Sequence, residues 1–542
     1  MSVPTDTALA HALDLLRRGQ FAHARAVLEV CPPGPRVEIL LAHAHAGCNR
    51  VHEAARLLCR QAHANPGARH PARDMLDLLL PHDRVEEAEA VLRAVRQRAG
   101  RDIRTHDMLG ELLLQRGRTA EAQAVLADGL SLSPAQLSTG NLMAVCFMEQ
   151  GEFAAGHDLL RYILNHHPDS AMTHANLAHL LAAWNRTDAA LEAHGRALAL
   201  RPDDPQLRMN HALTLLKTGR MDEGWDEYEW RHRLPGRLRL PSAGLLPVLE
   251  PDADLRGRSV LITREGGLGD MLMMLRFVPV LADMGARVYV QAPFTLHGLI
   301  RRMGCVRRVF DDRRPPPAHD WHCPFLSLPR VLRRTAGHAG RSVPYLRAEP
   351  ALVQYWAPFL PTGDGLRVGL VWGGASRPDV PAAHAMDRRR SIPLRALAPL
   401  AGIAGVNLVS LQMGTYATQM RDMPAGMRLY DPMEGVRDMD DTAALIAGLD
   451  VVVSVDTAIA HLAGAMGCPV ILLDRFDNCW RWLSGRTDSP WYPNLRIVRQ
   501  LRAGQWDDVV RRLCSMLAAR DLPPARRDGP TLTDQKRNAK LD

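Results

Sequence analysis

A period of 34 residues runs through the first half of this 542-residue chain and limits its fold more than any other pattern. Turn segments that read small residue, polar residue, apolar residue begin, in equal steps, at Asn49, Asp83, Gly117, Gly151, Asn185 and Gly219. Gly19 begins one more such turn, 30 residues before Asn49. Five positions after the starts stand Ala24, Ala54, Ala88, Ala122, Gly156, Ala190 and Gly224. A fixed period of this length predicts a stack of similar supersecondary units.

Each unit has the features of two helices joined by a tight turn. Gly, Asn or Asp stands where the chain leaves helical dihedrals, and a small residue stands where the helices approach. Helix-breaking residues close the units at Pro32, Pro66, Gly100, Pro134, Pro168 and Pro202. The segment resembles the tetratricopeptide repeat, most clearly at Asn176, Leu177, Ala178, Leu181, Ala190, Ala197 and Pro202.

We therefore expect an all-α tetratricopeptide superhelix of about seven units over residues 1–234. Such arrays form a concave groove, which favours a binding surface for a polypeptide. An arm that packs only on the second half, or that makes a homodimer, is the alternative interpretation.

In the second half, short apolar runs alternate with helical stretches. The runs predict strands at 259–263, 287–290, 367–372, 407–411, 451–454 and 469–473. Strand–helix alternation predicts parallel sheets with helices on both faces. The fold class is therefore predicted to be α + α/β, with a pair of doubly wound, Rossmann-like domains after the repeats.

The predicted boundaries follow from composition and from the two clusters of strands. A linker with prolines and glycines is expected over 235–256, and a disordered tail over 520–542. The first α/β domain is predicted over 257–350 and the second over 365–518. Ligands in such folds bind at the carboxyl ends of the strands.

Three motifs follow predicted strands. Gly266, Gly267 and Gly269 allow a tight strand-to-helix turn and close ligand approach, and Asp270 is expected at the helix start, facing a cleft, unless it is a plain helix cap. Asp456 and Thr457 cap a helix whose free N–H groups suit a diphosphate, with His461 on the same side or, alternatively, packed in the core. Arg388, Arg389 and Arg390 are predicted in a loop, either solvated or neutralising a leaving group.

Composition excludes several classes of function. The net charge is +8, but only Lys217, Lys536 and Lys540 are lysines, and the arginines are spread along the chain, which argues against a nucleic-acid footprint. Nine cysteines without a CxxC pair predict free thiols in a reducing compartment. No secretory leader and no run of 18 apolar residues is visible, so we expect a cytoplasmic protein without a membrane span.

Several motifs occur together in one order, and together they resemble a bacterial family that joins tetratricopeptide repeats to a glycosyltransferase domain. They are the Gly-Leu-Gly-Asp turn ending at Asp270, the segments 390–394 and 454–464, and the stretches 224–229 and 488–493. The catalytic half is similar to glycosyltransferase family 9, the heptosyltransferases, which have the GT-B fold. The layout also resembles O-GlcNAc transferase, more distantly.

The resemblance implies a nucleotide-sugar donor, inversion at the anomeric carbon, and transfer without a metal or other cofactor. By motif position, Asp270 is the general base that takes a proton from the acceptor hydroxyl. The residues implied to bind the donor are Gly267, Gly269, Arg390, Gln412, Asp456, Thr457, Ala458 and His461.

The chain departs from the family pattern at several places. Gly266 replaces a common Gln, Ala458 replaces the Gly of Asp-Thr-Gly, Met413 replaces a frequent Lys, and a loop rich in Asn and Pro is altered at 373–378. These changes keep the proposed base and leave the nucleotide, the sugar and the acceptor open.

The predicted function is an inverting glycosyltransferase whose repeats recruit a protein or glycan acceptor. A catalytically silent tetratricopeptide scaffold is the alternative. A GT-B enzyme that epimerises or phosphorolyses sugars is a third, which the polypeptide groove disfavours.

Overall fold

The computed structural model describes residues 5–66, 68–236, 241, 243–311, 315–333, 343–377 and 380–525. The chain divides into two compact units, Met1–Leu180 and Leu181–Asp542. Each is described by itself. Most of the predicted tail, residues 526–542, lies outside the described residues.

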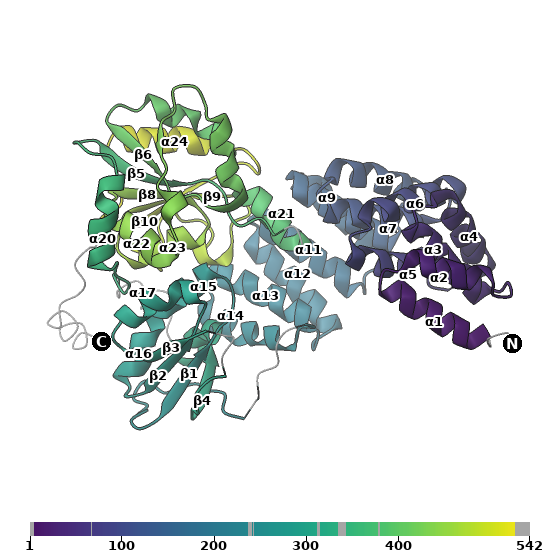
Figure 1. Ribbon diagram of the computed structural model, residues 1–542, viewed down its shortest axis with the longest axis horizontal. Helices are drawn as coiled ribbons and strands as arrows, with labels where there is room; N and C mark the ends of the chain where they lie inside the picture. The colour runs from purple at the N-terminus through teal and green to yellow at the C-terminus, as the bar shows by residue number, and fades with distance from the viewer. Residues whose placement is uncertain are drawn as a thin grey trace. The chain divides into compact units, whose positions relative to one another are not determined.

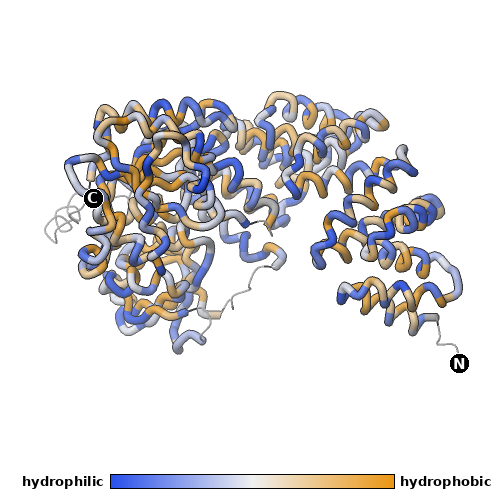
Figure 2. Tube along the Cα trace, turned by 45° about the horizontal axis from the view of Figure 1, so that its top comes forward, coloured by the Kyte–Doolittle hydropathy of each residue, from blue (hydrophilic) through white to orange (hydrophobic). Residues whose placement is uncertain are grey.

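The first unit is a stack of helical hairpins (Figure 1). Its helices are α1 (Thr5–Arg17), α2 (Phe21–Glu29), α3 (Pro35–Gly47), α4 (Val51–Ala64), α5 (Pro71–Leu79), α6 (Val85–Arg98), α7 (Ile103–Gln115), α8 (Thr119–Leu132), α9 (Leu137–Gln150), α10 (Phe153–His166) and α11 (Ala171–Ala183), the last crossing the unit boundary. Apolar and polar residues recur along each helix, as an amphipathic stack requires (Figure 2).

The 34-residue register is confirmed by the backbone. All the predicted turn residues have positive φ: Gly19, Asn49, Asp83, Gly117, Gly151, Asn185 and Gly219. The small residues five positions later are buried: Ala24, Ala54, Ala88, Ala122, Gly156, Ala190 and Gly224. The turn chemistry and the close helix approach were therefore both readable from the sequence.

The second unit begins with the last repeat helices. These are α12 (Thr187–Leu200), α13 (Pro205–Thr218), α14 (Met221–Tyr228) and the 3-10 helix η2 (Glu229–Arg233). They belong to the same compact unit as the two sheets, so the division of the chain at Leu180 falls inside the repeat array and before residue 234.

Two parallel sheets form the rest of this unit. The first has the order β3-β2-β1-β4, with β1 (Ser259–Thr263), β2 (Arg287–Gln291), β3 (Val306–Phe310) and β4 (Trp321–Pro324). The second has the order β10-β9-β8-β5-β6-β7, with β5 (Leu366–Val371), β6 (Val406–Ser410), β7 (Leu429–Tyr430), β8 (Val451–Val455), β9 (Val470–Asp474) and β10 (Leu495–Arg499). β8 and β9 are buried at every residue, as expected of central parallel strands.

Helices alternate with the strands of both sheets. The first sheet has α15 (Leu268–Met274), α16 (Val278–Asp283), α17 (His297–Arg302) and α18 (Leu328–Val331). The second has α20 (Pro350–Trp356), α21 (Pro381–Arg390), α22 (Met439–Ala447), α23 (Ala458–Ala465) and α24 (Asp507–Ala518). Short 3-10 helices lie between them, among them η11 (Trp480–Trp482). The predicted fold class, a helical repeat array followed by paired parallel α/β domains, is confirmed.

Two local expectations were wrong. The stretch 245–249, expected within a linker, packs on the first sheet: the N–H groups of Leu246 and Leu249 donate to the carbonyls of His322 and Val331, and both leucine side chains are buried. The three arginines expected in a loop are the last turn of α21, where positive charge favours the helix C-terminus.

Candidate functional site

Two strand-to-helix turns meet in the second unit, one from each sheet. The turn after β1 leads into α15, and the turn after β8 leads into α23. A Cβ atom on Gly269 would lie 2.8 Å from His461 Cδ2 and 3.5 Å from the Cα of Ala458. Only glycine permits this approach. The structure therefore brings together the predicted residues of both turns, although about 190 residues separate them.

The glycines of the first turn are explained by Asp270. Gly266 has a φ of +73°, and a Cβ there would lie 2.7 Å from Asp270 Oδ2. The N–H of Gly267, which precedes α15, donates to Asp270 Oδ2 at 2.9 Å. Asp270 thus caps the start of its own helix with one oxygen. This contact confirms the capping interpretation for Oδ2, and Oδ1 takes no part in the cap.

Arg481 of η11 occupies Asp270 Oδ1. Its Nε donates to Oδ1 at 3.0 Å, and its Nη2 donates to the same oxygen. The guanidinium also lies over the ring of Trp480, 4.5 Å from its centroid. Burial raises the pKa of Asp270, but the Arg481 charge outweighs it, so the pKa is lower than that of an ordinary aspartate. Asp270 is a carboxylate at neutral pH. Its ion pair with Arg481 joins the turn after β1 of the first sheet to η11, which follows β9 of the second sheet.

The sequence analysis did not predict Arg481. One arginine among so many carries no signal of its own. The available signal was its setting, Cys-Trp-Arg-Trp at 479–482, where two tryptophans flank a charge shortly after a buried strand.

The second turn is built as predicted. Thr457 precedes α23, and its Oγ1 accepts the N–H of Ile459 at 3.3 Å and contacts Ser454 Oγ at 3.0 Å. Asp456 follows β8 and is surrounded by positive charge. Burial raises the pKa of Asp456, but Arg481, followed by His461 and Arg390, lowers it below the ordinary value. Asp456 is therefore also ionised.

His461 is the fourth residue of α23 and is buried. Its Nδ1 lies 3.0 Å from the hydroxyl of Tyr492, and its ring stacks on Trp482 with 5.0 Å between centroids. Burial lowers the pKa of His461 to about 4, so the ring is neutral at pH 7. These are the contacts of a packing histidine, which was the alternative interpretation. Its predicted role in donor binding stays a prediction.

Arg390 lies beside this turn, at the end of α21. Its Nη1 donates to the carbonyl of Asp456 at 3.0 Å, and its Nε and Nη2 donate to Asp387 Oδ1 at 3.0 and 2.9 Å. The side chain is therefore fixed next to the start of α23. Gly374 approaches it so closely that a Cβ there would lie 2.2 Å from Arg390 Nη2.

Gln412 follows β6 and is used inside the protein. Its Oε1 accepts the N–H groups of Trp372 and Gly373 at 2.9 and 2.8 Å, and its Nε2 donates to the carbonyls of Gly373 and Met413 at 3.1 and 2.8 Å. An amide offers two donors and one acceptor oxygen. The side chain holds the ends of β5 and β6 together, and its predicted contact with the donor stays a prediction.

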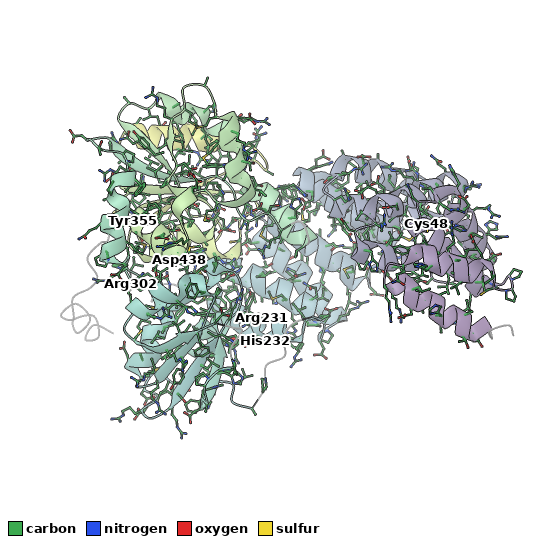
Figure 3. All side chains as sticks on the ribbon, viewed as in Figure 1. Cys48, Arg231, His232, Arg302, Tyr355 and Asp438 are labelled. Atoms are coloured by element: carbon green, nitrogen blue, oxygen red, sulfur yellow. The ribbon has the colours of Figure 1, made fainter. Side chains whose placement is uncertain are left out.

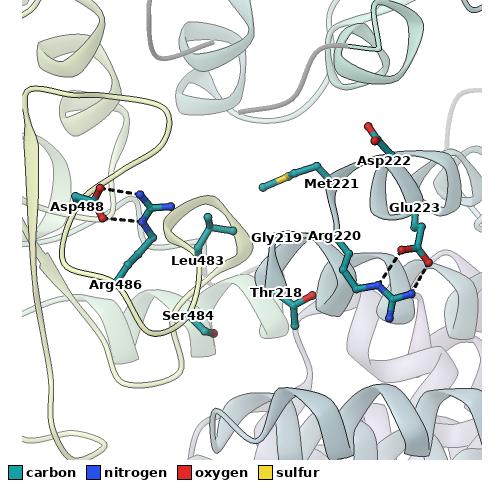
Figure 4. A pocket seen from close by; sticks show the side chains of 10 residues that line it. All are labelled: Thr218, Gly219, Arg220, Met221, Asp222, Glu223, Leu483, Ser484, Arg486 and Asp488. Atoms are coloured by element: carbon teal, nitrogen blue, oxygen red, sulfur yellow. Dashed lines mark hydrogen bonds and ion pairs between the residues drawn. The ribbon is translucent and has the colours of Figure 1, made fainter. Parts of the chain in front are cut away.

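A separate open pocket of about 660 Å³ lies between the α13–α14 turn and the segment after η11 (Figure 4). Four of its five charged lining residues form two pairs, Arg220 with Glu223 and Arg486 with Asp488, and the fifth is Asp222. None of the predicted site residues lines it.

Within the described ranges, no cluster of three or more His, Cys, Asp or Glu side chains has an arrangement that could hold a metal ion. The same part of the chain contains no helix with the length and apolar character needed to cross a membrane.

Comparison with known proteins adds a family match. Residues 423–512 match glycosyltransferase family 9 (heptosyltransferase). The matched stretch contains the Asp456–Thr457 turn, His461 and Arg481, but not Asp270, Arg390 or Gln412. The second unit thus carries a glycosyltransferase domain.

Protein FlbA of Caulobacter vibrioides is 28% identical over 377 residues, which are 65% of this chain and 62% of FlbA. The alignment therefore spans less than two thirds of that relative's length. Among solved structures, E. coli ADP-heptose LPS heptosyltransferase II is similar over 48% of this chain and 99% of its own, with 15% identity and a TM-score of 0.35. MamA from Desulfovibrio magneticus RS-1 is similar over 30% of this chain and 90% of its own, with 17% identity and a TM-score of 0.25.

Proposed function

We propose that the second unit transfers a sugar from a nucleotide-sugar donor to a hydroxyl of a protein or glycan acceptor, and that the repeats recruit this acceptor. The observation that carries the proposal is the meeting of two turns: a carboxylate on the side of the first sheet faces the start of α23 on the side of the second. A base and an anion site at one place are what single-step glycosyl transfer requires.

The donor's diphosphate is assigned to the start of α23. The first N–H groups of a helix have no partner within the helix and attract an anion. Asp456 and Thr457 form this turn, Ala458 begins the helix, and Arg390 adds a fixed guanidinium beside it. These groups stabilise the negative charge that develops on the leaving diphosphate, so the proposal needs no metal ion.

Asp270 is assigned as the general base. It takes the proton of the acceptor hydroxyl as that oxygen attacks the anomeric carbon, while the bond from that carbon to the diphosphate oxygen breaks. Attack from the Asp270 side and departure on the α23 side place the two oxygens on opposite faces of the sugar. The expected outcome is inversion. Gly267 and Gly269 keep this turn free of side chains.

The first experiment is a thermal-shift screen with UDP-, GDP-, ADP- and dTDP-sugars. A ligand that binds only the folded protein raises its apparent stability in proportion to ln(1 + [L]/Kd). All ten tryptophans lie between residues 184 and 506, so tryptophan emission reports the second unit alone. A shift with one nucleotide class supports the transferase. No shift with any class, in a folded sample, favours the silent scaffold instead.

Asp270→Asn tests the base. We expect transfer to fall by about 10²–10⁴-fold, the usual contribution of a general base, while the donor binds at least as tightly as it binds the wild type. The matched control is Asp254→Asn, because Asp254 is exposed and paired only with Arg256. Unaltered turnover in Asp270→Asn would exclude the assignment.

Arg390→Ala tests the phosphate contact. Losing a hydrogen bond to a charged group weakens binding by about 10-fold or more. The matched control is Arg388→Ala, two residues earlier in α21 and exposed. The donor Kd, measured by calorimetry, should rise in Arg390→Ala alone. An unchanged Kd in that variant contradicts the assignment.

A further inference from the structure

Arg481 is the charged group that both halves of the site share. It belongs to the side of the second sheet, as Asp456 and α23 do, yet its guanidinium is paired with Asp270 from the first. Its side chain is 20% exposed, and that of Asp270 is 14% exposed. The pair is thus largely removed from water, where an ion pair is stronger than on a surface.

This pair restrains the proposed base. Asp270 Oδ2 accepts the Gly267 N–H, and Oδ1 accepts two N–H groups of Arg481. An acceptor hydroxyl must compete with these donors for a carboxylate oxygen. The Arg481 charge also makes Asp270 a weaker proton acceptor. Proton transfer to Oδ1 therefore requires Arg481 to release that oxygen.

The guanidinium still has donors to offer. Two of its nitrogens, Nε and Nη2, bind Asp270, whereas Nη1 contacts Cys479 Sγ at 3.7 Å. Sulfur is a weak acceptor, and a guanidinium carries five N–H donors arranged as a fork that fits phosphate oxygens. Cys479 Sγ in turn donates to Asp456 Oδ2 at 3.5 Å, so a single side chain separates Arg481 from the turn that precedes α23.

We propose that Arg481 exchanges partners during the reaction, leaving Asp270 for the diphosphate of the bound donor and so freeing Oδ1 for the acceptor hydroxyl. This inference rests on the proposed function. A diphosphate offers more charge and more acceptor oxygens than one carboxylate, and it pairs bidentately with a guanidinium. The base becomes available only after the donor has bound.

The exchange predicts that one substitution in the site, Asp270→Asn, strengthens nucleotide binding. If Arg481 must leave Asp270 to bind the donor, the pair competes with donor binding and weakens the apparent affinity. Asp270→Asn removes that competition, so a nucleoside diphosphate should bind the variant more tightly than the wild type. Removal of the Asp270 charge alone would tighten nucleotide binding in the Arg481→Gln background as well, whereas the exchange predicts tightening only where Arg481 is present.

The experiment is a double-mutant cycle on the full chain, with UDP, GDP, ADP and dTDP as probes and Kd measured by calorimetry. The variants are Asp270→Asn, Arg481→Gln, the double variant, and Arg481→Lys. Asp270→Asn should tighten binding roughly 10-fold, and Arg481→Gln should weaken it by about 10-fold or more. In the Arg481→Gln background the Asp270→Asn effect should vanish. Arg481→Lys should restore part of the affinity.

The outcomes separate this inference from the proposed function. If no nucleotide binds the wild type, the proposed donor site fails, and this inference fails with it. If a nucleotide binds but Asp270→Asn leaves its Kd unchanged or raises it, the exchange is excluded and the donor site stands. Should Arg481→Gln fail to fold by tryptophan emission, the sign of the Asp270→Asn effect and the Arg481→Lys affinity still decide.

Discussion

The helical hairpins of residues 5–180 and the last hairpin, α13–α14 with η2, follow the same 34-residue period but make different contacts. One position after the recurring small residue, the earlier units have Arg25, Glu89, Gln123 and His157, all partly exposed, and the small Ala55, which is buried. The equivalent residue in the last hairpin is Trp225, which is 2% exposed and packs edge-on against Trp480, with 5.2 Å between ring centroids. At this repeat position, side chains that are small or partly exposed are thus replaced by a large core side chain in the last hairpin.

Charged contacts show the same contrast. In the first unit, Arg118 pairs with Glu89 and Glu121 at the surface. In the last hairpin, Arg231 is 4% exposed and donates to both carboxylate oxygens of Glu265, at 2.7 and 3.0 Å, in the turn that leads to Asp270 (Figure 3). The last repeat therefore contacts both the Asp270 turn and the segment that carries Arg481. The last repeat thus packs as part of the second unit.

Trp225→Ala should produce the largest effect on this comparison. Truncating a buried tryptophan costs about 3–5 kcal/mol, so we expect a large loss of stability in the second unit. The measurement is denaturant unfolding followed by tryptophan emission, which nine other tryptophans still report. The counterpart is Leu160→Ala, a fully buried residue of the first unit. It should shift helical circular dichroism and leave the emission transition in place; a shared shift would mean that the units unfold together.

Arg231→Met should produce the next largest loss of stability. Removing one partner of a buried ion pair costs about 3–5 kcal/mol, because the carboxylate of Glu265 is left without its cation. Glu229 also pairs with Arg231 and loses the same cation, so two carboxylates are left without it. Arg118→Met in the first unit should change stability little, since exposed pairs contribute little. Equal effects of the two substitutions on unfolding midpoints would show that burial does not distinguish the two regions.

Lys217 gives the smallest and most specific effect, a dependence on pH. Its Nζ donates to the carbonyl of Ala182 at 2.7 Å, and burial lowers its pKa from 10.5 to about 8, with Asp477 opposing and Arg475 adding to the shift. Between those pH values the unfolded chain holds a proton that the folded chain has lost. The stability of the wild type relative to Lys217→Met should therefore be lowest below pH 8.

That relative stability should rise by up to about 3 kcal/mol towards pH 10.5. The difference between the two proteins removes the contributions of the tyrosines and cysteines, which titrate in the same range. Unfolding followed by tryptophan emission from pH 7 to 10 measures it. A difference that stays flat with pH would show that Lys217 keeps its charge when folded.

The strands show what the sequence could and could not predict. The six predicted strands are the six interior strands of the two sheets. β1, β8 and β9 are buried at every residue, as their continuous apolar runs indicate, whereas β2 is buried only at alternate residues. The missed strands, β3, β4, β7 and β10, are the edges of the two sheets. β3 and β10 each contain two arginines, and β7 has two residues. Edge strands are short or charged because one side is open, and a pattern of apolar runs does not detect them.

The site shows the same limit. Asp270, Asp456 and Thr457 were predictable because strand-to-helix turns have local signatures in glycines and caps. Arg481 and the Arg231–Glu265 pair were not, because each depends on two segments that meet only in the folded unit. The stretch 224–229 was recognised as a motif, but nothing within it names Trp480 as its partner. Turns can be predicted from residues that are neighbours in the sequence, whereas contacts between distant segments cannot.

The division of the chain after Leu180 determines where repeats can be exchanged or removed. Because the last hairpin contacts the Asp270 turn through Arg231 and η11 through Trp225, removal of residues 1–234 would leave Glu265 and Trp480 without these partners. An exchange of whole repeats before Leu181 leaves those contacts untouched. If the repeats recruit the acceptor as proposed, grafting repeats from another array at that junction, or shortening the array there by one 34-residue unit, should change which acceptor is captured and leave the contacts of Asp270 and Arg481 as they are.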